Sequence, residues 1–114
     1  MGRGGGRVER RGMAKPAYAV ANLVIQDKER FGAEYASKVA GTLGPHGGTY
    51  ALKAFLPELK CVEGPVQMLQ VILKFPSLEK AVEWHDSPEY QAIVPARLET
   101  TDTEKSTFYI AEGM

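Results

Sequence analysis

The sequence predicts an α+β domain of the ferredoxin-like kind, in which a four-stranded antiparallel sheet carries its helices on one face. Two observations predict this fold. Segments with strand alternation and segments with helical spacing follow one another in the order β-α-β-β-α-β. The 114 residues also match the length of one domain.

Residues 17–25, AYAVANLVI, alternate as a strand that is apolar on both faces. Tyr18, Val20, Asn22 and Val24 point one way, and the residues between them point the other way. A strand with two apolar faces belongs in the middle of a sheet that is covered on both sides. Asn22 is the one polar side chain inside it.

Asp27 is a suitable N-cap for a helix that runs to about Leu43, where Gly44-Pro45 ends it. Glu34 and Lys38 are expected to form an exposed pair one turn apart. The apolar side chains that recur every four residues predict the buried stripe of this helix: Phe31, Tyr35, Val39 and Leu43.

Two strands are expected next, from Thr49 to about Leu56 and from Val66 to Phe75. Strict alternation would place the following side chains on one face of the first strand: Tyr50, Leu52, Ala54 and Leu56. In the second strand, one face is apolar and the other is mixed, with Gln70, Ile72 and Lys74 on the mixed face. A mixed face borders a cavity or an interface.

Ser77 is the expected N-cap of a helix from Leu78 to about His85, and Ser87-Pro88 starts a second one. That second helix is expected to bend or break near Pro95. Residues 105–112 form the last strand, with Phe108 and Ile110 on one face. On the helix that starts at Leu78, we expect one side to hold Leu78, Ala81, Val82 and His85.

The first twelve residues differ in kind from the rest, because they are rich in Gly and Arg and hold a single apolar side chain, Val8. We interpret residues 1–12 as a disordered leader or a cloning remnant and residues 13–114 as a single domain. The leader carries four Arg against Glu9, so the body carries a net charge of −3 in a chain whose total is zero.

That slightly acidic body argues against a nucleic-acid partner, which needs a basic surface. The single cysteine, Cys61, rules out an internal disulfide and suits a reducing compartment, so a cytoplasmic location is expected. No apolar run approaches the roughly 20 residues of a membrane span. Helices on one face would leave the other apolar face of the sheet open, and pairing two sheets would cover it. The sequence therefore predicts a homodimer through the sheet faces.

Several segments resemble an uncharacterised family, a "domain of unknown function" group of the dimeric α+β barrel superfamily. They are AYAVANLVIQDKERFGAEYA, GPHGGTY, ILKFPSLEKAVEWHDSPEYQAIVPARL and YIAEG. The resemblance implies a ferredoxin-like subunit in a two-sheet barrel dimer. It leaves the chemistry open, because the superfamily holds monooxygenases, isomerases, cyclases and pure binding proteins. Two features depart from the family's pattern: Lys74 stands where members tend to be acidic, and the loop at 61–65 lacks a Trp.

His46 follows the first helix in a Gly-rich turn and is a candidate general acid or base. It could equally cap the helix terminus. Trp84, His85 and Tyr90 surround the SPEY turn and could form an aromatic wall with a proton donor. Alternatively, Trp84 is a core residue, and Tyr90 closes the helix onto the sheet with its hydroxyl bonded to backbone.

Arg97 lies two helical turns after Tyr90 and could hold a ligand carboxylate or enolate, or could pair with Glu89 or Asp86. Asn22 could border the ligand or bond across an interface. No metal site or cofactor is expected, because no metal-ligand or nucleotide motif is present. The prediction is a protein that binds, and transforms by acid/base chemistry, a small aromatic or enolisable metabolite. The rival prediction is a non-catalytic binding or structural dimer.

Overall fold

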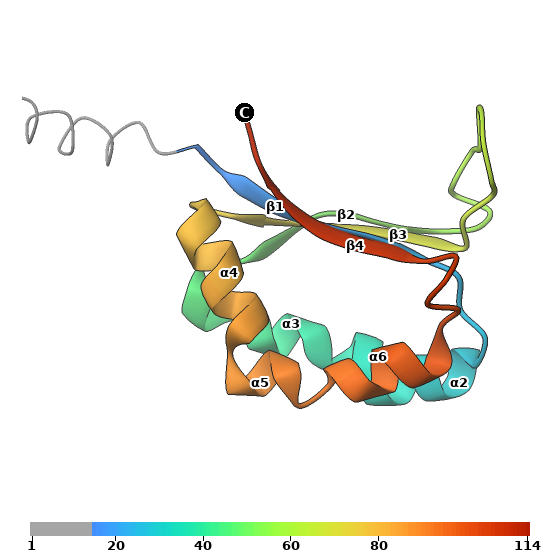
Figure 1. Ribbon diagram of the computed structural model, residues 1–114, viewed down its shortest axis with the longest axis horizontal. Coiled ribbons are helices and arrows are strands. Elements are labelled where there is room, and N and C mark those ends of the chain that lie inside the picture. Colours follow the sequence, from blue (N-terminus) through green and yellow to red (C-terminus); the bar gives the residue numbers. More distant parts are fainter. Residues whose placement is uncertain (1–14) are drawn as a thin grey trace, which may run out of the picture.

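A computed structural model describes residues 15–114, so the leader predicted for residues 1–12 lies outside the described chain. The strands form one layer and the helices a second layer on one face of it (Figure 1). The strand order is β2-β3-β1-β4, and all neighbouring strands are antiparallel. The fold is therefore the predicted ferredoxin-like α+β fold. The strands are β1 (Ala17–Leu23), β2 (Thr49–Phe55), β3 (Leu69–Phe75) and β4 (Thr107–Glu112).

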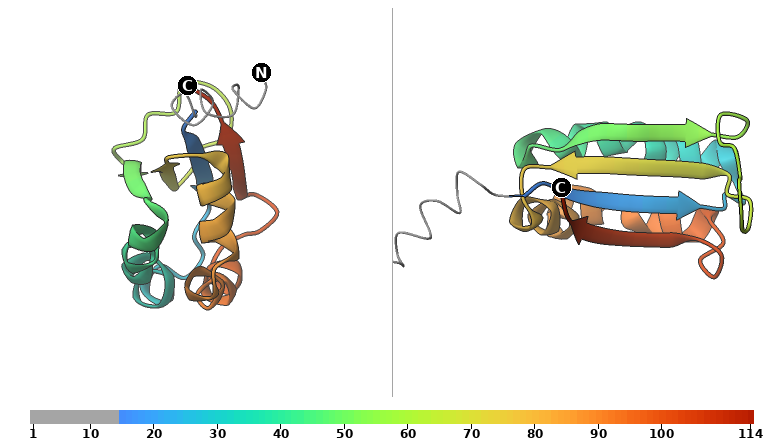
Figure 2. Two further views of the ribbon diagram at one scale, coloured as in Figure 1. Left: turned by 90° about the vertical axis from the view of Figure 1, so that its left-hand side faces the viewer. Right: turned by 90° about the horizontal axis from the view of Figure 1, so that it is seen from above.

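The helical layer has two parts, one from each half of the chain. The first is a continuous helix of α2 (Lys28–Phe31), the π-helical turn η1 (Gly32–Ala36) and α3 (Ser37–Leu43), closed by the 3₁₀ turn η2 (Gly44–His46). The second comprises α4 (Leu78–Asp86), α5 (Pro88–Gln91) and α6 (Val94–Thr100). Seen from above, the four strands lie side by side over these helices (Figure 2).

The central strand, β1, has the two predicted faces. Its helix-facing side chains are small except for the last one, and all are buried: Ala17, Ala19, Ala21 and Leu23. The register with β3 and β4 pairs Ala21 with Val71 and Phe108, so these residues also face the helices. Ala19 and Ala21, in the middle of the sheet, leave room between the sheet and the helices.

The first helix begins as predicted, because the Asp27 carboxylate accepts a hydrogen bond from the backbone N–H of Arg30 at 3.1 Å. Its predicted stripe is buried throughout: Phe31, Tyr35, Val39 and Leu43. The predicted ion pair is wrong, because Glu34 pairs with Arg30 at 2.9 Å and with no lysine.

The turn after the first helix depends on two glycines. Gly47 has φ +72°, a left-handed conformation that favours glycine. At Gly48, a Cβ would lie 2.6 Å from a ring carbon of Phe75. The predicted end of the helix at Gly44-Pro45 is extended by only the short η2 turn.

The face predicted for β2 is wrong in part, because a bulge between Tyr50 and Leu52 shifts the alternation by one residue. Tyr50 pairs with Leu73 and faces the helices, whereas Leu52 pairs with Ile72 and faces away from them. Lys53 follows Tyr50 onto the helix side.

The buried side of α4 also differs from the prediction, since Ala81 and Trp84 are buried while Leu78 and Val82 are exposed. The two predicted caps are confirmed: Ser77 accepts a hydrogen bond from the N–H of Lys80, and Ser87 accepts one from the N–H of Tyr90. The break after α5 comes at residues 92–93, just before the predicted bend at Pro95.

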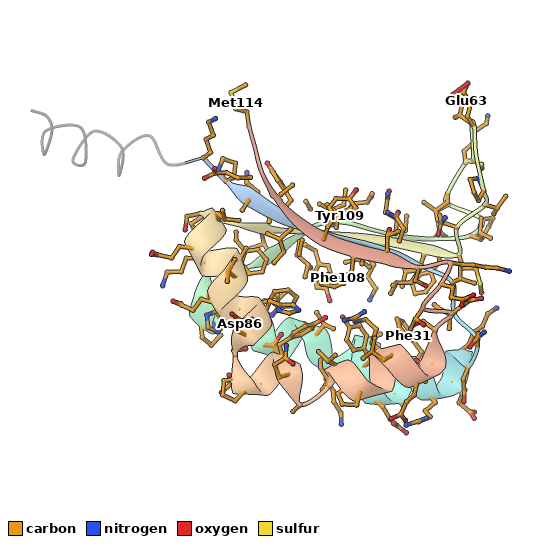
Figure 3. The ribbon with its side chains drawn as sticks, in the orientation of Figure 1. Phe31, Glu63, Asp86, Phe108, Tyr109 and Met114 are labelled. Carbon is orange, nitrogen blue, oxygen red and sulfur yellow. The ribbon has the colours of Figure 1, made fainter. Side chains whose placement is uncertain are left out.

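The sheet face opposite the helices carries apolar side chains in its middle and the polar group of Asn22, Gln70 and Thr107 toward one end. Its larger apolar members are Tyr18, Val20, Leu52, Ile72 and Tyr109. Tyr109 and its neighbour Phe108 point to opposite sides of β4, Phe108 toward the helices and Tyr109 away from them (Figure 3). Within residues 15–114, no helix covers the strands on this face, and only the loop between β2 and β3 rises beside Asn22 and Gln70 at one end (Figures 1 and 2).

Candidate functional site

Trp84 is the centre of the aromatic packing between α4 and the sheet. It is fully buried, and its ring centroid lies 4.1 Å from that of Tyr90 and 5.2 Å from that of Phe75. Its Nε1–H donates to Thr42 Oγ1 at 2.9 Å. The satisfied donor and the complete burial assign Trp84 to the core, where it fixes the position of Tyr90.

Tyr90 is also fully buried, and its hydroxyl partner is Tyr35 rather than the backbone group considered from the sequence. The two hydroxyl oxygens lie 2.6 Å apart, and either can donate. Burial raises the pKa of Tyr35 well above its usual value, to which the neighbouring Tyr90 adds. Burial also raises the pKa of Tyr90, while the positive charge of Arg97 opposes the shift. Both hydroxyls are therefore neutral at physiological pH.

Arg97 projects from α6 over two aromatic rings. Its guanidinium carbon lies 4.7 Å from the ring centroid of Phe108 and 6.0 Å from that of Tyr35. Among residues 15–114, no carboxylate forms an ion pair with Arg97, and its buried Nε has no hydrogen-bond partner. The pairings considered with Glu89 and Asp86 are thus absent from the described chain.

These four residues form one group, which we call the tyrosine–arginine cluster: Tyr35, Tyr90, Arg97 and Phe108. They come from η1, α5, α6 and β4, four segments that are far apart in the sequence. The cluster combines two neutral hydroxyls, one cation that has no counter-ion among residues 15–114, and aromatic walls. That combination can bind an anionic oxygen attached to a flat organic group.

His85 lies at the border of this cluster. Its ring centroid is 5.7 Å from that of Tyr90 and 6.1 Å from that of Phe108, and the side chain is partly exposed. Its Nδ1 lies 3.1 Å from an oxygen of Asp86. In the tautomer that donates Nδ1–H to Asp86, Nε2 carries the lone pair and can accept a proton.

An apolar cavity of about 30 Å³ lies between the sheet and the first helix, directly beside the cluster. Tyr35 and Phe108 form part of its wall, and Ala19 and Ala21 lie on its sheet side. Lys53 is its one charged lining residue, from the edge strand β2. The cavity thus exists where the alanines of β1 leave space that larger side chains would fill.

Two of the predicted site residues lie away from the cluster. His46 contacts Glu83, with Nδ1 and Oε2 3.3 Å apart. Glu83 and His85 are two residues apart in α4 and so project about 200° apart around the helix axis. Asn22 lies on the opposite face of the sheet, where it bonds to Thr107 at 3.2 Å and to Gln70 at 2.8 Å. The structure therefore brings together Trp84, His85, Tyr90 and Arg97, but neither His46 nor Asn22.

The sequence interpretation missed Tyr35 and Phe108 as site residues. Both were assigned to apolar stripes, Tyr35 on the first helix and Phe108 on the last strand. A hydroxyl in the middle of an otherwise apolar stripe was the available signal, because a buried hydroxyl needs a partner. The π-helical turn that holds Tyr35 is a second sign, visible only in the structure.

No group of three or more His, Cys, Asp or Glu side chains in residues 15–114 could hold a metal ion. The helices of that same part of the chain include none that is long and apolar enough to cross a membrane.

The family model of the domain of unknown function DUF1330 matches residues 16–114. The chain belongs to this family. The match confirms the resemblance identified in the sequence and covers every strand and helix described above. Comparison of this DUF1330 chain with curated proteins finds no match.

Solved structures with a similar fold come from several bacteria. A protein of unknown function from Rhodopseudomonas palustris is 15% identical and has a TM-score of 0.71 over 96% of this chain and 92% of its own. A Dabb family protein with a ferredoxin-like fold from Mesorhizobium loti is 12% identical, with a TM-score of 0.62 over 88% of this chain and 98% of its own. A dimeric protein of unknown function with a ferredoxin-like fold from Bacteroides fragilis is 14% identical, with a TM-score of 0.53 over 86% and 96%. At these identities the likeness shows the fold alone.

Proposed function

We propose that this protein binds a small aromatic or enolisable metabolite that carries an anionic oxygen, with the oxygen held by Arg97. The flat part of the ligand contacts Tyr35 and Phe108, the aromatic members of the tyrosine–arginine cluster. The observation that carries the proposal is a half-buried guanidinium that has no anionic partner among residues 15–114 and whose Nε has no hydrogen bond.

The buried Nε of Arg97, which has no hydrogen-bond partner among residues 15–114, supports an anion because burial of an unpaired polar group is costly. A buried donor without a partner costs about 1–3 kcal/mol, and more when it is charged. A ligand carboxylate, enolate or phenolate would recover that cost with a charge-assisted hydrogen bond. The Tyr35 and Tyr90 hydroxyls are neutral, so they can add a donor to the same oxygen without opposing its charge.

The cavity beside the cluster supports a ligand with an apolar body. Its volume of about 30 Å³ is room for about one water molecule. A ring enters when side chains of the wall move apart, and the small side chains of Ala19 and Ala21 leave space for it on the sheet side. The apolar lining favours a hydrocarbon or aromatic body over a sugar.

His85 is the proposed acid/base group for an enolisable ligand. It borders Tyr90 and Phe108 and is partly exposed, so it can exchange a proton with solvent after each transfer. Arg97 and the tyrosine hydroxyls would stabilise the negative charge that develops on the ligand oxygen when a proton leaves the neighbouring carbon. His46 has no part in this step, because it lies against Glu83.

The homodimer predicted from the sequence belongs to the same proposal. The uncovered sheet face carries Val20, Ile72 and Tyr109, and a second copy would cover them. The dimeric relative from Bacteroides fragilis supports this arrangement. We also propose a cytoplasmic location, because a chain with a single cysteine suits a reducing compartment.

Calorimetry with benzoate and benzamide tests the proposal, because the two probes share a shape and differ in charge. The wild type should bind benzoate and should bind benzamide at least about tenfold more weakly, the factor expected for a charge-assisted hydrogen bond. The R97M variant should lose that preference while retaining the wild-type melting temperature. Equal binding of the two probes by the wild type would contradict the proposal.

A further inference from the structure

A second hollow, of about 330 Å³, adjoins the cavity at the end of the sheet where β2 finishes and β3 begins. We propose that it holds a hydrocarbon tail of the ligand, and that Phe31 separates the tail from the acidic head and so sets which ligands fit. The inference rests on the proposed function and adds the ligand class: organic acids with a hydrocarbon tail.

The composition of the hollow selects a hydrocarbon. Its wall includes Phe55, Leu56 and Met68, and Lys28 is its one ionisable lining residue. Phe55 and Leu56 are 41% and 44% exposed, although both are large and apolar. Large apolar side chains that are exposed around one shared concavity are typical of a ligand site, whereas single exposed apolar side chains are common on any protein surface.

The hollow adjoins the cavity, and this determines where the ligand's tail lies relative to its acidic head. Phe31 and Ala36 line both the hollow and the cavity, so the two spaces share a wall. Phe31 is 3% exposed, and its ring centroid lies 5.3 Å from that of Tyr35. The path from the hollow to the tyrosine–arginine cluster therefore passes Phe31 first and Tyr35 second.

The volumes assign the larger part of the ligand to the hollow. Small-molecule sites commonly have volumes of roughly 300–1,000 Å³, which includes the hollow but excludes the 30 Å³ cavity. Rotation of Phe31 joins the two spaces. Phe31 ends α2 and directly precedes the π-helical turn, and Gly32, which has no side chain, lines the hollow next to it.

A series of 4-alkylbenzoates, from methyl to hexyl, tests the inference by calorimetry. Each methylene that enters the hollow should increase the affinity of the wild type about fourfold, the factor that corresponds to about 0.8 kcal/mol. The L56W variant fills the hollow without touching the cavity, so it should bind benzoate normally and lose the gain from longer tails. L78W adds the same ring at the start of α4, at the other end of the molecule (Figure 1), and should keep the gain.

The outcomes separate this inference from the proposed function. Failure of the wild type to bind benzoate contradicts the proposed function. Normal benzoate binding with no gain from longer tails, or a gain that L56W leaves intact, overturns the tail site alone. F31A provides a second variant: it should increase affinity for the longest tails, and unchanged affinity would overturn the role of Phe31. A change in sedimentation of L56W would instead assign the hollow to a second protein chain, which also overturns the inference.

Discussion

The hydroxyl oxygens of Tyr35 and Tyr90 lie 2.6 Å apart inside the core, where one hydroxyl donates a hydrogen bond to the other. The pair joins the π-helical turn of the first helix to α5, so it fixes the distance between the two halves of the helical layer. Arg97 lies against the same pair. The stability of the fold and the geometry of the proposed site therefore depend on the same two side chains.

Removal of either hydroxyl alone should destabilise the protein, because the buried hydroxyl that remains loses its hydrogen-bond partner. Y90F leaves the buried Tyr35 hydroxyl without its partner, at a cost of about 1–3 kcal/mol, and Y35F does the same for Tyr90. The Y35F/Y90F double variant should cost less than the sum of the two single variants. Urea unfolding of the four proteins measures this coupling, and strictly additive costs would show that the pair is not a hydrogen bond.

The same pair predicts a loss of stability at alkaline pH. Well below pH 10, both hydroxyls are protonated in the folded and unfolded states, so neither contributes a pH dependence. Above pH 10, the unfolded tyrosines release protons while burial holds the folded pKa values higher, so unfolding becomes more favourable. Each tyrosine adds a slope of up to about 1.4 kcal/mol per pH unit. The double variant Y35F/Y90F should lose this part of the slope in urea titrations between pH 9 and 11; an identical slope would contradict the assignment.

Two glycines, Gly48 in the turn before β2 and Gly41 within α3, should respond in opposite ways to replacement by alanine. G48A drives a Cβ to 2.6 Å from Phe75, which is 1% exposed, so it should cost about 1–3 kcal/mol. G41A lies within α3 with nothing within 4 Å, so it should stabilise the protein by up to about 1 kcal/mol. Thermal unfolding of both variants gives the comparison, and a neutral G48A would mean that the Phe75 ring moves without cost.

The uncovered sheet face predicts the effect of a single charge on assembly. The wild type should sediment at twice the 12.5 kDa chain mass at micromolar concentration. V20D places an unpaired charge on the covered face of the proposed dimer and should give monomers or aggregates. The matched control is V82D on the exposed side of α4, which should stay dimeric. A wild type that sediments as a 12.5 kDa monomer would contradict the dimer.

The sequence was sufficient for the element order and for most of the buried faces, because periodicity reports local geometry directly. The stripe of the first helix and the two faces of β1 are examples. The prediction for the face of β2 was wrong because the bulge after Tyr50 depends on how β2 pairs with β3. The residues of a strand do not by themselves show where a bulge inserts an extra residue. The buried side of α4 was wrong because Trp84 was treated apart from the helix's apolar pattern.

The candidate site was only partly predictable for a different reason. Trp84, His85, Tyr90 and Arg97 are close in sequence, so helical spacing could group them. Tyr35 and Phe108 join them only through the packing of two helices and the register of β4, which are relationships between distant segments. We grouped His46 with them because the first helix was expected to end near the same edge of the sheet. In the structure His46 contacts Glu83 instead and lies away from the cluster.

Native mass spectrometry of the protein as purified from cells, compared with R97M prepared in the same way, tests the central claim most directly. Each wild-type chain should carry an organic acid of small mass, fragmentation should reveal a hydrocarbon or aromatic body, and R97M should lack the ligand. A neutral ligand, or an acid that R97M retains at wild-type occupancy, would contradict the proposal that the guanidinium of Arg97 recognises the ligand.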